Sequence, residues 1–195
     1  MTKTTTKQKI INAAQTLLYQ EGFEAMSPRK VLKLSGAGQG SLYHHFSGKQ
    51  ELARTVLDGV ADDLIAVTDS IFRNDNLAPD EKIEQFLSRK RHGLLGCKLG
   101  RLANEKAFQD EDLRAPLEKY FSFVLAELKR TLKQGVDRGI YHSELPIEAV
   151  AYLLVASVQG GFVLSKSLND DDAVNRATSG ALELLKSYQI KAPNQ

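Results

Sequence analysis

The sequence predicts an all-α protein of about nine helices. Apolar residues recur at three- and four-residue spacing along most of the 195-residue chain, as they do on the buried face of a helix. No segment shows the strict alternation of apolar and polar residues that marks a strand, and there is no internal repeat. Hydrophobic residues make up 42% and charged residues 26% of the chain, which is ordinary for a globular protein.

The first three predicted helices are short and have clear start and stop residues. The first covers residues 6–20 and stops at Gly22, a natural residue just past a helix end. Ser27 and Pro28 supply the N-cap and the first residue of the second helix. The third follows a Gly-containing turn and covers about residues 39–45.

The fourth predicted helix is long. Ser47 is expected to cap it, with Gln50 completing a capping box, and it should reach about Asn74. An Asn- and Pro-rich loop follows. Five further helices are expected near residues 80–95, 99–109, 113–138, 146–168 and 170–189.

Basic residues are concentrated at the N-terminal end. Residues 1–60 hold eight Lys or Arg and four Asp or Glu, a balance of +4, whereas residues 61–195 have a balance of −2. Such a distribution suits an N-terminal segment that faces phosphate. The alternative is a charged, solvated face without a partner.

Several protein classes are excluded by simple features. Cys97 is the sole cysteine, so an intramolecular disulfide is impossible. Residues 1–9 are rich in Thr and Lys and do not form a signal peptide. The longest apolar stretch, residues 149–164, is interrupted by Gly160 and Gly161, and a bilayer span needs about 20 apolar residues. We therefore expect a cytoplasmic protein that does not cross a membrane.

Residues 27–46 have the plan of a helix-turn-helix, in which the second helix enters the DNA major groove. On a helical wheel Leu42 and Phe46 fall together and should face inward. Glutamine can read adenine, serine can bond either partner, and an aromatic ring can meet a thymine methyl. Side chains of these kinds occupy the outward face: Gln39, Gly40, Ser41, Tyr43 and His44.

This segment resembles the signature of the TetR/AcrR family of transcriptional regulators. The match reaches back through Gly22 and Phe23 and covers about residues 6–57. The residues that carry it are Gly40-Ser41-Leu42-Tyr43-His44-His45-Phe46, Lys49 and Glu51-Leu52.

Two positions depart from the usual family pattern. Gly38 replaces the Ser or Thr that commonly caps the recognition helix, which should weaken the cap by roughly a few tenths of a kcal/mol. Gln39 stands where a Lys is frequent. The ammonium of Lys is thus replaced by an amide that can form hydrogen bonds with a base.

The resemblance implies a role for particular residues and two domains. A helix-turn-helix DNA-binding domain would cover residues 1–57, and a helical effector-binding and dimerisation domain residues 58–195. The groove would be met by Gln39, Gly40, Ser41, Tyr43 and His44. Phosphates would be held by Ser27, Arg29 and Lys49, with a basic arm of Lys3, Lys7 and Lys9.

The resemblance also implies a repressor. A homodimer would bind a palindromic operator and release it when a small molecule occupies the helical domain. Small residues on the last two helices, from Ala149 to Gly161 and from Ala173 to Leu184, resemble the family's dimer face. Two alternatives to a small-molecule effector are a protein partner and redox sensing by Cys97, which is expected at the head of a helix near Lys98.

Catalytic, metal and cofactor sites are not predicted. His44 and His45 are adjacent and point about 100° apart on a helix, so they rarely share an ion. Cys97 has no surrounding nucleophile motif, and a lone cysteine is more often a small buried hydrophobe. The Gly-rich run 36–40 lacks the strand and the closing Lys of a phosphate loop. We therefore do not expect an enzyme.

Overall fold

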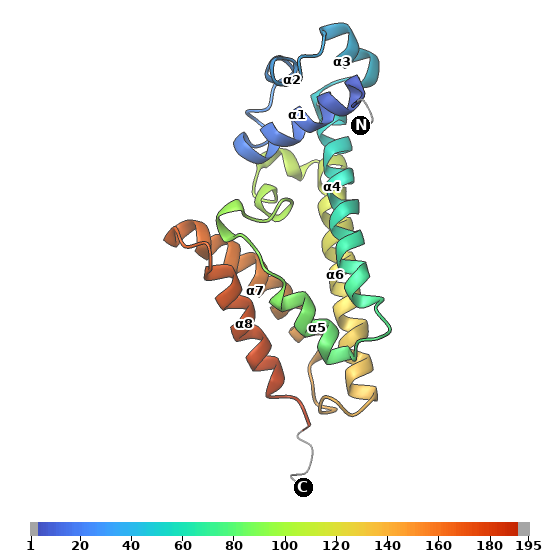
Figure 1. The fold of residues 1–195 in the computed structure, drawn as a ribbon, viewed down its shortest axis with the longest axis vertical. Coiled ribbons are helices and arrows are strands. Elements are labelled where there is room, and N and C mark those ends of the chain that lie inside the picture. Colours follow the sequence, from blue (N-terminus) through green and yellow to red (C-terminus); the bar gives the residue numbers. More distant parts are fainter. Residues whose placement is uncertain (1–3, 191–195) are drawn as a thin grey trace. The chain divides into compact units, whose positions relative to one another are not determined.

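The computed structural model describes residues 4–190 and confirms the all-α prediction (Figure 1). Within these residues the sole β feature is an isolated bridge between Tyr141 and Gln189. Three short 3-10 helices cover Gly93–Leu95 (η1), Gly100–Leu102 (η2) and Lys106–Gln109 (η3). The α-helices are α1 (Thr6–Glu21), α2 (Pro28–Ser35), α3 (Gln39–His45), α4 (Lys49–Phe72), α5 (Pro79–Ser88), α6 (Glu111–Asp137), α7 (Ile147–Leu168) and α8 (Ala173–Lys186).

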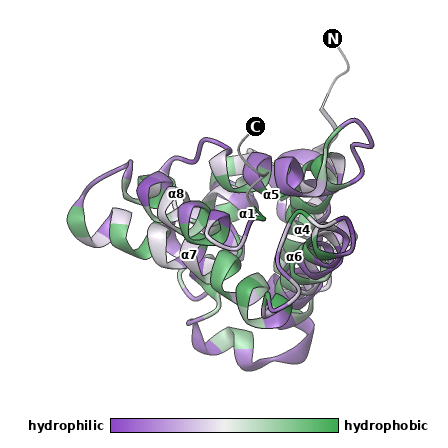
Figure 2. Cartoon of the chain, turned by 90° about the horizontal axis from the view of Figure 1, so that it is seen from below, coloured by the Kyte–Doolittle hydropathy of each residue, from purple (hydrophilic) through white to green (hydrophobic). Residues whose placement is uncertain are grey.

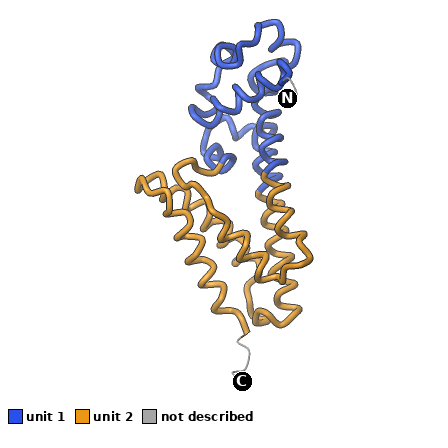
Figure 3. Tube along the Cα trace, viewed as in Figure 1, with its two compact units in different colours: residues 1–63, 98–120 blue, residues 64–97, 121–195 orange. Residues whose placement is uncertain are grey.

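The chain divides into two compact units (Figure 3). Unit 1 comprises Met1–Asp63 and Lys98–Tyr120, and unit 2 comprises Leu64–Cys97 and Phe121–Gln195. The chain passes between the units inside α4, between Cys97 and Lys98, and inside α6. Unit 1 thus contains the N-terminal helices together with a segment that lies far along the sequence.

In unit 1, α1 packs against both α2 and α3. Its apolar stripe, which includes Ile10 and Leu18, is fully buried. As predicted, Ser27 caps α2: its hydroxyl accepts the Lys30 N–H at 3.3 Å. Gly36 ends α2 in the left-handed conformation, with φ of 67°, which glycine adopts without strain.

The start of α4 differs in detail from the prediction. The helix begins at Lys49. The side chain that bonds back to Ser47 is that of Glu51, whereas Gln50 was predicted. The Glu51 carboxylate accepts both the backbone N–H and the hydroxyl of Ser47 at 2.6 Å. Because the helix starts later than expected, the side chain that can bond to Ser47 belongs to the next residue along the chain.

Unit 2 is built around the close pairing of α7 and α8. Gly161 makes that approach possible, because a Cβ there would lie 2.8 Å from the Cα of Val174. Apolar and polar residues alternate around the helices (Figure 2), so each helix has a side that can be buried.

Two predicted helices are shorter than expected or absent. α5 ends at Ser88, and the buried Arg91 guanidinium donates to the carbonyls of Phe86, Leu87 and Arg89. These bonds satisfy the carbonyls that a longer helix would have paired. The segment 99–109, predicted as one helix, forms the two 3-10 helices η2 and η3 instead.

α7 has the length that the sequence predicted, Ile147–Leu168 against an expected 146–168. It runs 22 residues without a break at Gly160 or Gly161, and its mean hydropathy of 1.7 would suffice, by length and composition alone, for a membrane span. A single helix of this kind is weak evidence for a membrane span, because a core helix of a globular protein can pass the same test. Several of its apolar side chains are exposed, among them Leu153, Val163 and Leu164. Part of its apolar surface thus remains open in the single chain.

Candidate nucleic-acid interface

α3 presents a polar face to solvent and an apolar face to the interior of unit 1. Leu42 is 1% exposed and Phe46 2% exposed, which confirms the predicted inward face. Tyr43 is 51% exposed and packs on nothing that buries it. The other predicted groove residues divide into exposed Gln39, Gly40 and His44 and half-buried Ser41.

The glycines around α3 are not required by the packing of the chain. A Cβ added at Gly38 or at Gly40 would meet no atom within 4 Å, and neither residue has a positive φ. Gly38 precedes the helix as its N-cap without a side-chain bond. Glycine destabilises a helix by roughly 0.5–1 kcal/mol relative to alanine, so Gly40 carries a cost that its own fold does not explain.

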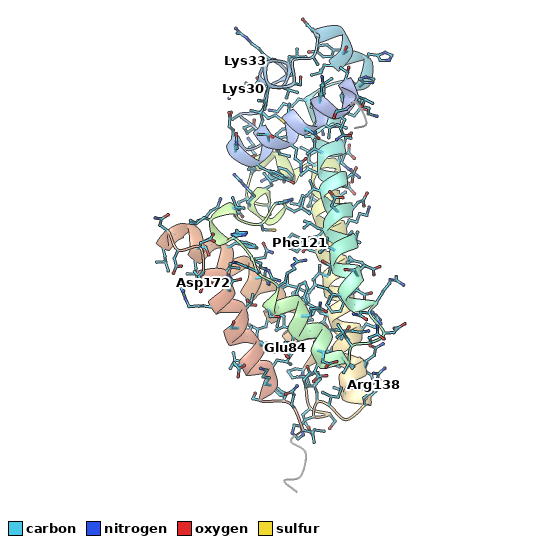
Figure 4. The ribbon with its side chains drawn as sticks, viewed as in Figure 1. Lys30, Lys33, Glu84, Phe121, Arg138 and Asp172 are labelled. Carbon is cyan, nitrogen blue, oxygen red and sulfur yellow. The ribbon has the colours of Figure 1, made fainter. Side chains whose placement is uncertain are left out.

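α2 carries the predicted phosphate residues Ser27 and Arg29 at its start. Ser27 is half-buried and occupied by its capping bond, whereas Arg29 is exposed. Lys30 forms an ion pair with Glu21, and Lys33 is exposed in the last turn (Figure 4). Arg29 and Lys33 are four residues apart and therefore lie on one side of α2.

Lys49 makes contacts within unit 1. Its Nζ donates to the carbonyl of Glu24 at 3.1 Å and lies 4.3 Å from the centre of the Phe23 ring. The side chain is half-buried at the first residue of α4. An ammonium has three N–H donors, so one bond to a carbonyl leaves two for another acceptor.

The electrostatics at the start of α4 are set by Ser47 and Glu51. Hydrogen bonds from the Ser47 hydroxyl and N–H, aided by the charge of Lys7, hold the pKa of Glu51 below its ordinary value. The Lys7 ammonium also lies 5.9 Å from the Phe46 ring centre. Of the predicted basic arm, Lys7 and Lys9 are exposed on α1, and Lys3 lies outside the described residues.

The remaining candidate residues do not gather into a chemical site. The His44 and His45 rings lie 4.9 Å apart. In the part of the chain that the structure describes, no three His, Cys, Asp or Glu side chains cluster as metal ligands would. Cys97 is half-buried between η1 and η2. The α-helix expected to begin there is absent, so a helix dipole cannot be invoked to activate its thiol.

Two family models match the chain, one in each half. A model described as bacterial regulatory proteins of the tetR family matches residues 10–56. A second, described as the tetracyclin repressor-like C-terminal domain, matches residues 82–181. The chain belongs to the TetR family. Because the first match contains α2 and α3 entire, this TetR-family protein is a helix-turn-helix transcriptional regulator.

Named relatives and solved structures agree with this membership. The HTH-type transcriptional regulator YxaF of Bacillus subtilis is 29% identical over 174 residues, which are 84% of this chain and 86% of YxaF. LmrA of the same organism is 27% identical, over 92% of this chain and 96% of its own. The crystal structure of reduced Escherichia coli NemR has the same fold: it aligns with a TM-score of 0.80 and 19% identity, covering 96% and 98% of the two chains.

Two residues at or near this candidate interface, Lys33 and Glu105, were not predicted from the sequence. Lys33 could have been, because its four-residue spacing from Arg29 places both on one face of α2. Glu105 contacts the turn between α1 and α2, 82 residues away from Phe23. No local sequence pattern indicates a contact between residues so far apart in the chain.

Proposed function

We propose that this TetR-family regulator is a cytoplasmic, homodimeric repressor that binds a palindromic operator through α3. Residues 1–57 act as the DNA-binding domain and residues 58–195 as the effector-binding and dimerisation domain. Gln39, Tyr43 and His44 meet base edges in the major groove, together with Gly40 and Ser41. The repressor-like description of the C-terminal match supports the direction of regulation.

The observation that carries this proposal is the outward face of α3. It joins exposed polar and aromatic side chains to a glycine that faces open space. Such a face has no use in the fold itself, whereas a DNA groove requires close backbone approach and hydrogen-bonding groups. Buried Leu42 and Phe46 anchor the helix from behind and keep that face rigid.

Phosphate contacts come from the edges of the same unit. Arg29 is exposed at the start of α2, where helix N–H groups also favour anions. Lys33 contacts a phosphate together with Ser27, Arg29 and Lys49, because it lies on the same side of α2 as Arg29. These contacts set the register of the protein on DNA and carry little sequence information.

Dimerisation uses the exposed apolar side chains of α7 and α8. Leu153, Leu164 and Leu184 are each about half exposed or more, at 48%, 48% and 63%. Several large apolar side chains exposed on two paired helices favour an interaction site there. A four-helix interface would bury it and would separate the two reading heads by about one DNA turn, 34–36 Å. A small molecule that changes this separation would release the operator.

The test is fluorescence anisotropy on operator and scrambled DNA at several salt concentrations. The operator is first sought as an inverted repeat in the DNA beside the gene. Gln39→Ala should relax discrimination at one base pair per half-site by about 1–3 kcal/mol. Lys49→Ala should weaken both DNAs similarly and lower the magnitude of the salt slope by about one per phosphate contact, hence about two per dimer.

Lys49→Met is the matched control for lost packing, because it keeps most of the length of the side chain and removes the charged ammonium with its N–H donors. It should behave like Lys49→Ala on DNA. If the unmodified protein shows no salt-dependent DNA affinity, or if Gln39→Ala and Lys49→Ala leave both affinity and slope unchanged, α3 does not read DNA and the proposed function fails.

A further inference from the structure

The turn between α1 and α2 is held by a residue from far along the chain. The backbone N–H of Phe23 donates to Oε2 of Glu105 at 2.8 Å. Both residues belong to unit 1, which includes Lys98–Tyr120. A bond from an N–H to a carboxylate is charge-assisted and about twice as strong as one between neutral groups. A residue far outside residues 1–57 therefore anchors a turn inside this predicted DNA-binding domain.

The shape of the turn is matched to this carboxylate. Gly22 has a φ of 85° and a ψ of 174°, a conformation that is open essentially to glycine alone. A Cβ at this position would lie 2.7 Å from Oε1 of Glu105. Gly22 thus both ends α1 and leaves the space in which the Glu105 carboxylate reaches the Phe23 N–H.

A second contact from the same segment supports the same residue. The Phe108 ring meets the Phe23 ring edge-on, with centres 6.3 Å apart and planes 79° apart. Phe108 is 4% exposed, and its N–H donates to the carbonyl of Glu105 at 3.0 Å. η3 and its N-cap residue Glu105 therefore bring an aromatic ring and a carboxylate to Phe23 from one short segment.

Lys49 contacts the turn as well. Its Nζ lies 4.3 Å from the Phe23 ring centre and donates to the Glu24 carbonyl at 3.1 Å. Phe23 and Glu24 thus form a platform for the ammonium, with a cation–π contact and a hydrogen bond. The position of Lys49 depends on the position of Phe23, which depends in turn on Glu105 and Phe108.

We propose that Glu105 is a positioning residue for DNA binding, acting through Phe23 on Lys49. This inference rests on the proposed function, in which Lys49 holds a phosphate. A charged side chain that is already ordered loses less conformational freedom when it binds, so its contact is stronger. Without Glu105 the platform loosens, and Lys49 must be ordered by the DNA itself.

The direction of the expected effect separates this role from simple electrostatics. Removing an acidic charge from a DNA-binding unit reduces repulsion and should strengthen binding to any DNA. Loss of a positioning residue should weaken it. Glu105→Ala removes both the charge and the acceptor for the Phe23 N–H, whereas Glu105→Gln removes the charge and keeps a carbonyl acceptor.

The experiment measures affinity for operator and scrambled DNA by fluorescence anisotropy on full-length protein. The variants are Glu105→Ala, Glu105→Gln, Lys49→Ala and the Lys49→Ala/Glu105→Ala double variant. Glu118→Ala, an exposed acidic residue of α6 in the same unit, is the charge control. Glu105→Ala should weaken both DNAs by roughly two- to tenfold per half-site, the range for one side chain that must be ordered.

The double variant decides the mechanism. If Glu105 acts through Lys49, Glu105→Ala adds no loss to Lys49→Ala, and Glu105→Gln retains most of the affinity. Unchanged affinity in Glu105→Ala, an additive loss in the double variant, or a Lys49→Ala variant that binds normally would each overturn the inference. Failure of the unmodified protein to bind DNA would instead count against the proposed function.

Folding is followed by thermal melts of every variant. Should Glu105→Ala fail to fold, Phe23→Leu replaces it, because this change keeps the N–H bonded to Glu105 and removes only the ring beneath Lys49. Phe23→Leu should also weaken both DNAs and add nothing to Lys49→Ala. Normal DNA affinity in a folded Phe23→Leu variant would overturn the inference.

Discussion

Glycines mark both α3 and the α7–α8 pair, and they do so for opposite reasons. At Gly40 of α3 an added Cβ would meet nothing within 4 Å. At Gly161 of α7 it would lie 2.8 Å from the Cα of Val174. The chain itself fills the space beside Gly161, whereas the space beside Gly40 is left for something else. Internal packing thus explains the glycine of α7, whereas the proposed contact with DNA would explain the glycine of α3.

The small-residue face that the sequence suggested for dimerisation has an exposed part and a buried part. Ala149, Ala156 and Gly160 are exposed on α7, whereas Ala173 and Ala181 of α8 are buried within one chain. Ala177 lies between these groups: its Cβ would be 3.2 Å from a Cβ at Gly161. Only the exposed set is available to a second copy.

The largest effect is expected from a charge placed on this exposed set. Ala156→Arg should dissociate the dimer, because an unpaired buried charge costs about 3–5 kcal/mol. Light scattering checks the mass, and circular dichroism checks that helix content is kept. Ala177→Arg should instead disrupt the α7–α8 contact inside one chain and lower helix content. A stable Ala156→Arg dimer would show that the interface lies elsewhere.

A smaller but still large effect should separate the two sides of α3. Leu42→Ala leaves a cavity behind the helix and should lower the free energy of unfolding by about 2–5 kcal/mol. Tyr43→Ala, one residue along on the exposed side, should change it by less than about 0.5 kcal/mol and yet weaken operator binding. Denaturant titrations and anisotropy measure the two quantities. Equal destabilisation by both changes would contradict the assigned faces.

Gly161→Ala should reduce the free energy of unfolding by about 1–3 kcal/mol, the usual range for overpacking. The matched control is Gly59→Ala, because Gly59 lies in α4 and an added Cβ there meets no atom within 4 Å. It should gain roughly 0.5–1 kcal/mol from improved helix propensity. Thermal melts of the two variants should therefore shift in opposite directions, and a shift in the same direction would refute the packing argument.

In Gly40→Ala, the free energy of unfolding and the affinity for the operator should change in opposite directions. The change should raise the free energy of unfolding by roughly 0.5–1 kcal/mol, since the helix gains propensity and no atom clashes. Affinity for the operator should fall, because the added methyl group occupies the space meant for DNA. A variant that is more stable and binds as well as the original would show that this glycine serves no recognition role.

The smallest effect is expected at acid pH. The pKa of Glu51 is lowered chiefly by the Ser47 hydroxyl, so its contribution to stability is present above the unfolded pKa and is lost as pH falls through the folded pKa. The melting temperature of the original protein should thus fall slightly more between neutral pH and about pH 3 than that of Glu51→Gln. Parallel pH profiles would show that the Ser47–Glu51 bond does not stabilise the start of α4.

Local rules predicted the helix-turn-helix well. The Ser27 cap and the inward positions of Leu42 and Phe46 were confirmed. They depend on neighbours within one or two helical turns, which a sequence displays directly. The same rules missed the early end of α5, where the carbonyls of the last turn are bonded by Arg91.

The contacts across long separations were out of reach of such rules. Glu105 was not noticed, because its carboxylate meets Phe23 only after the chain has folded back over 82 residues. The residues around it, 99–109, were predicted as one helix but form two 3-10 helices. Their buried positions, Leu102 and Phe108, are fixed by packing rather than by helical periodicity.

The helical class, the family and the outward face of α3 could all be predicted from local features of the chain. Helix caps, periodicity and a local signature suffice for these. Three features could be known only from the folded chain: which glycines face open space, which small residues of α7 and α8 are exposed, and what holds Lys49 in place. These depend on the distance between atoms remote in sequence, which is set by the sum of all packing interactions and by no single segment.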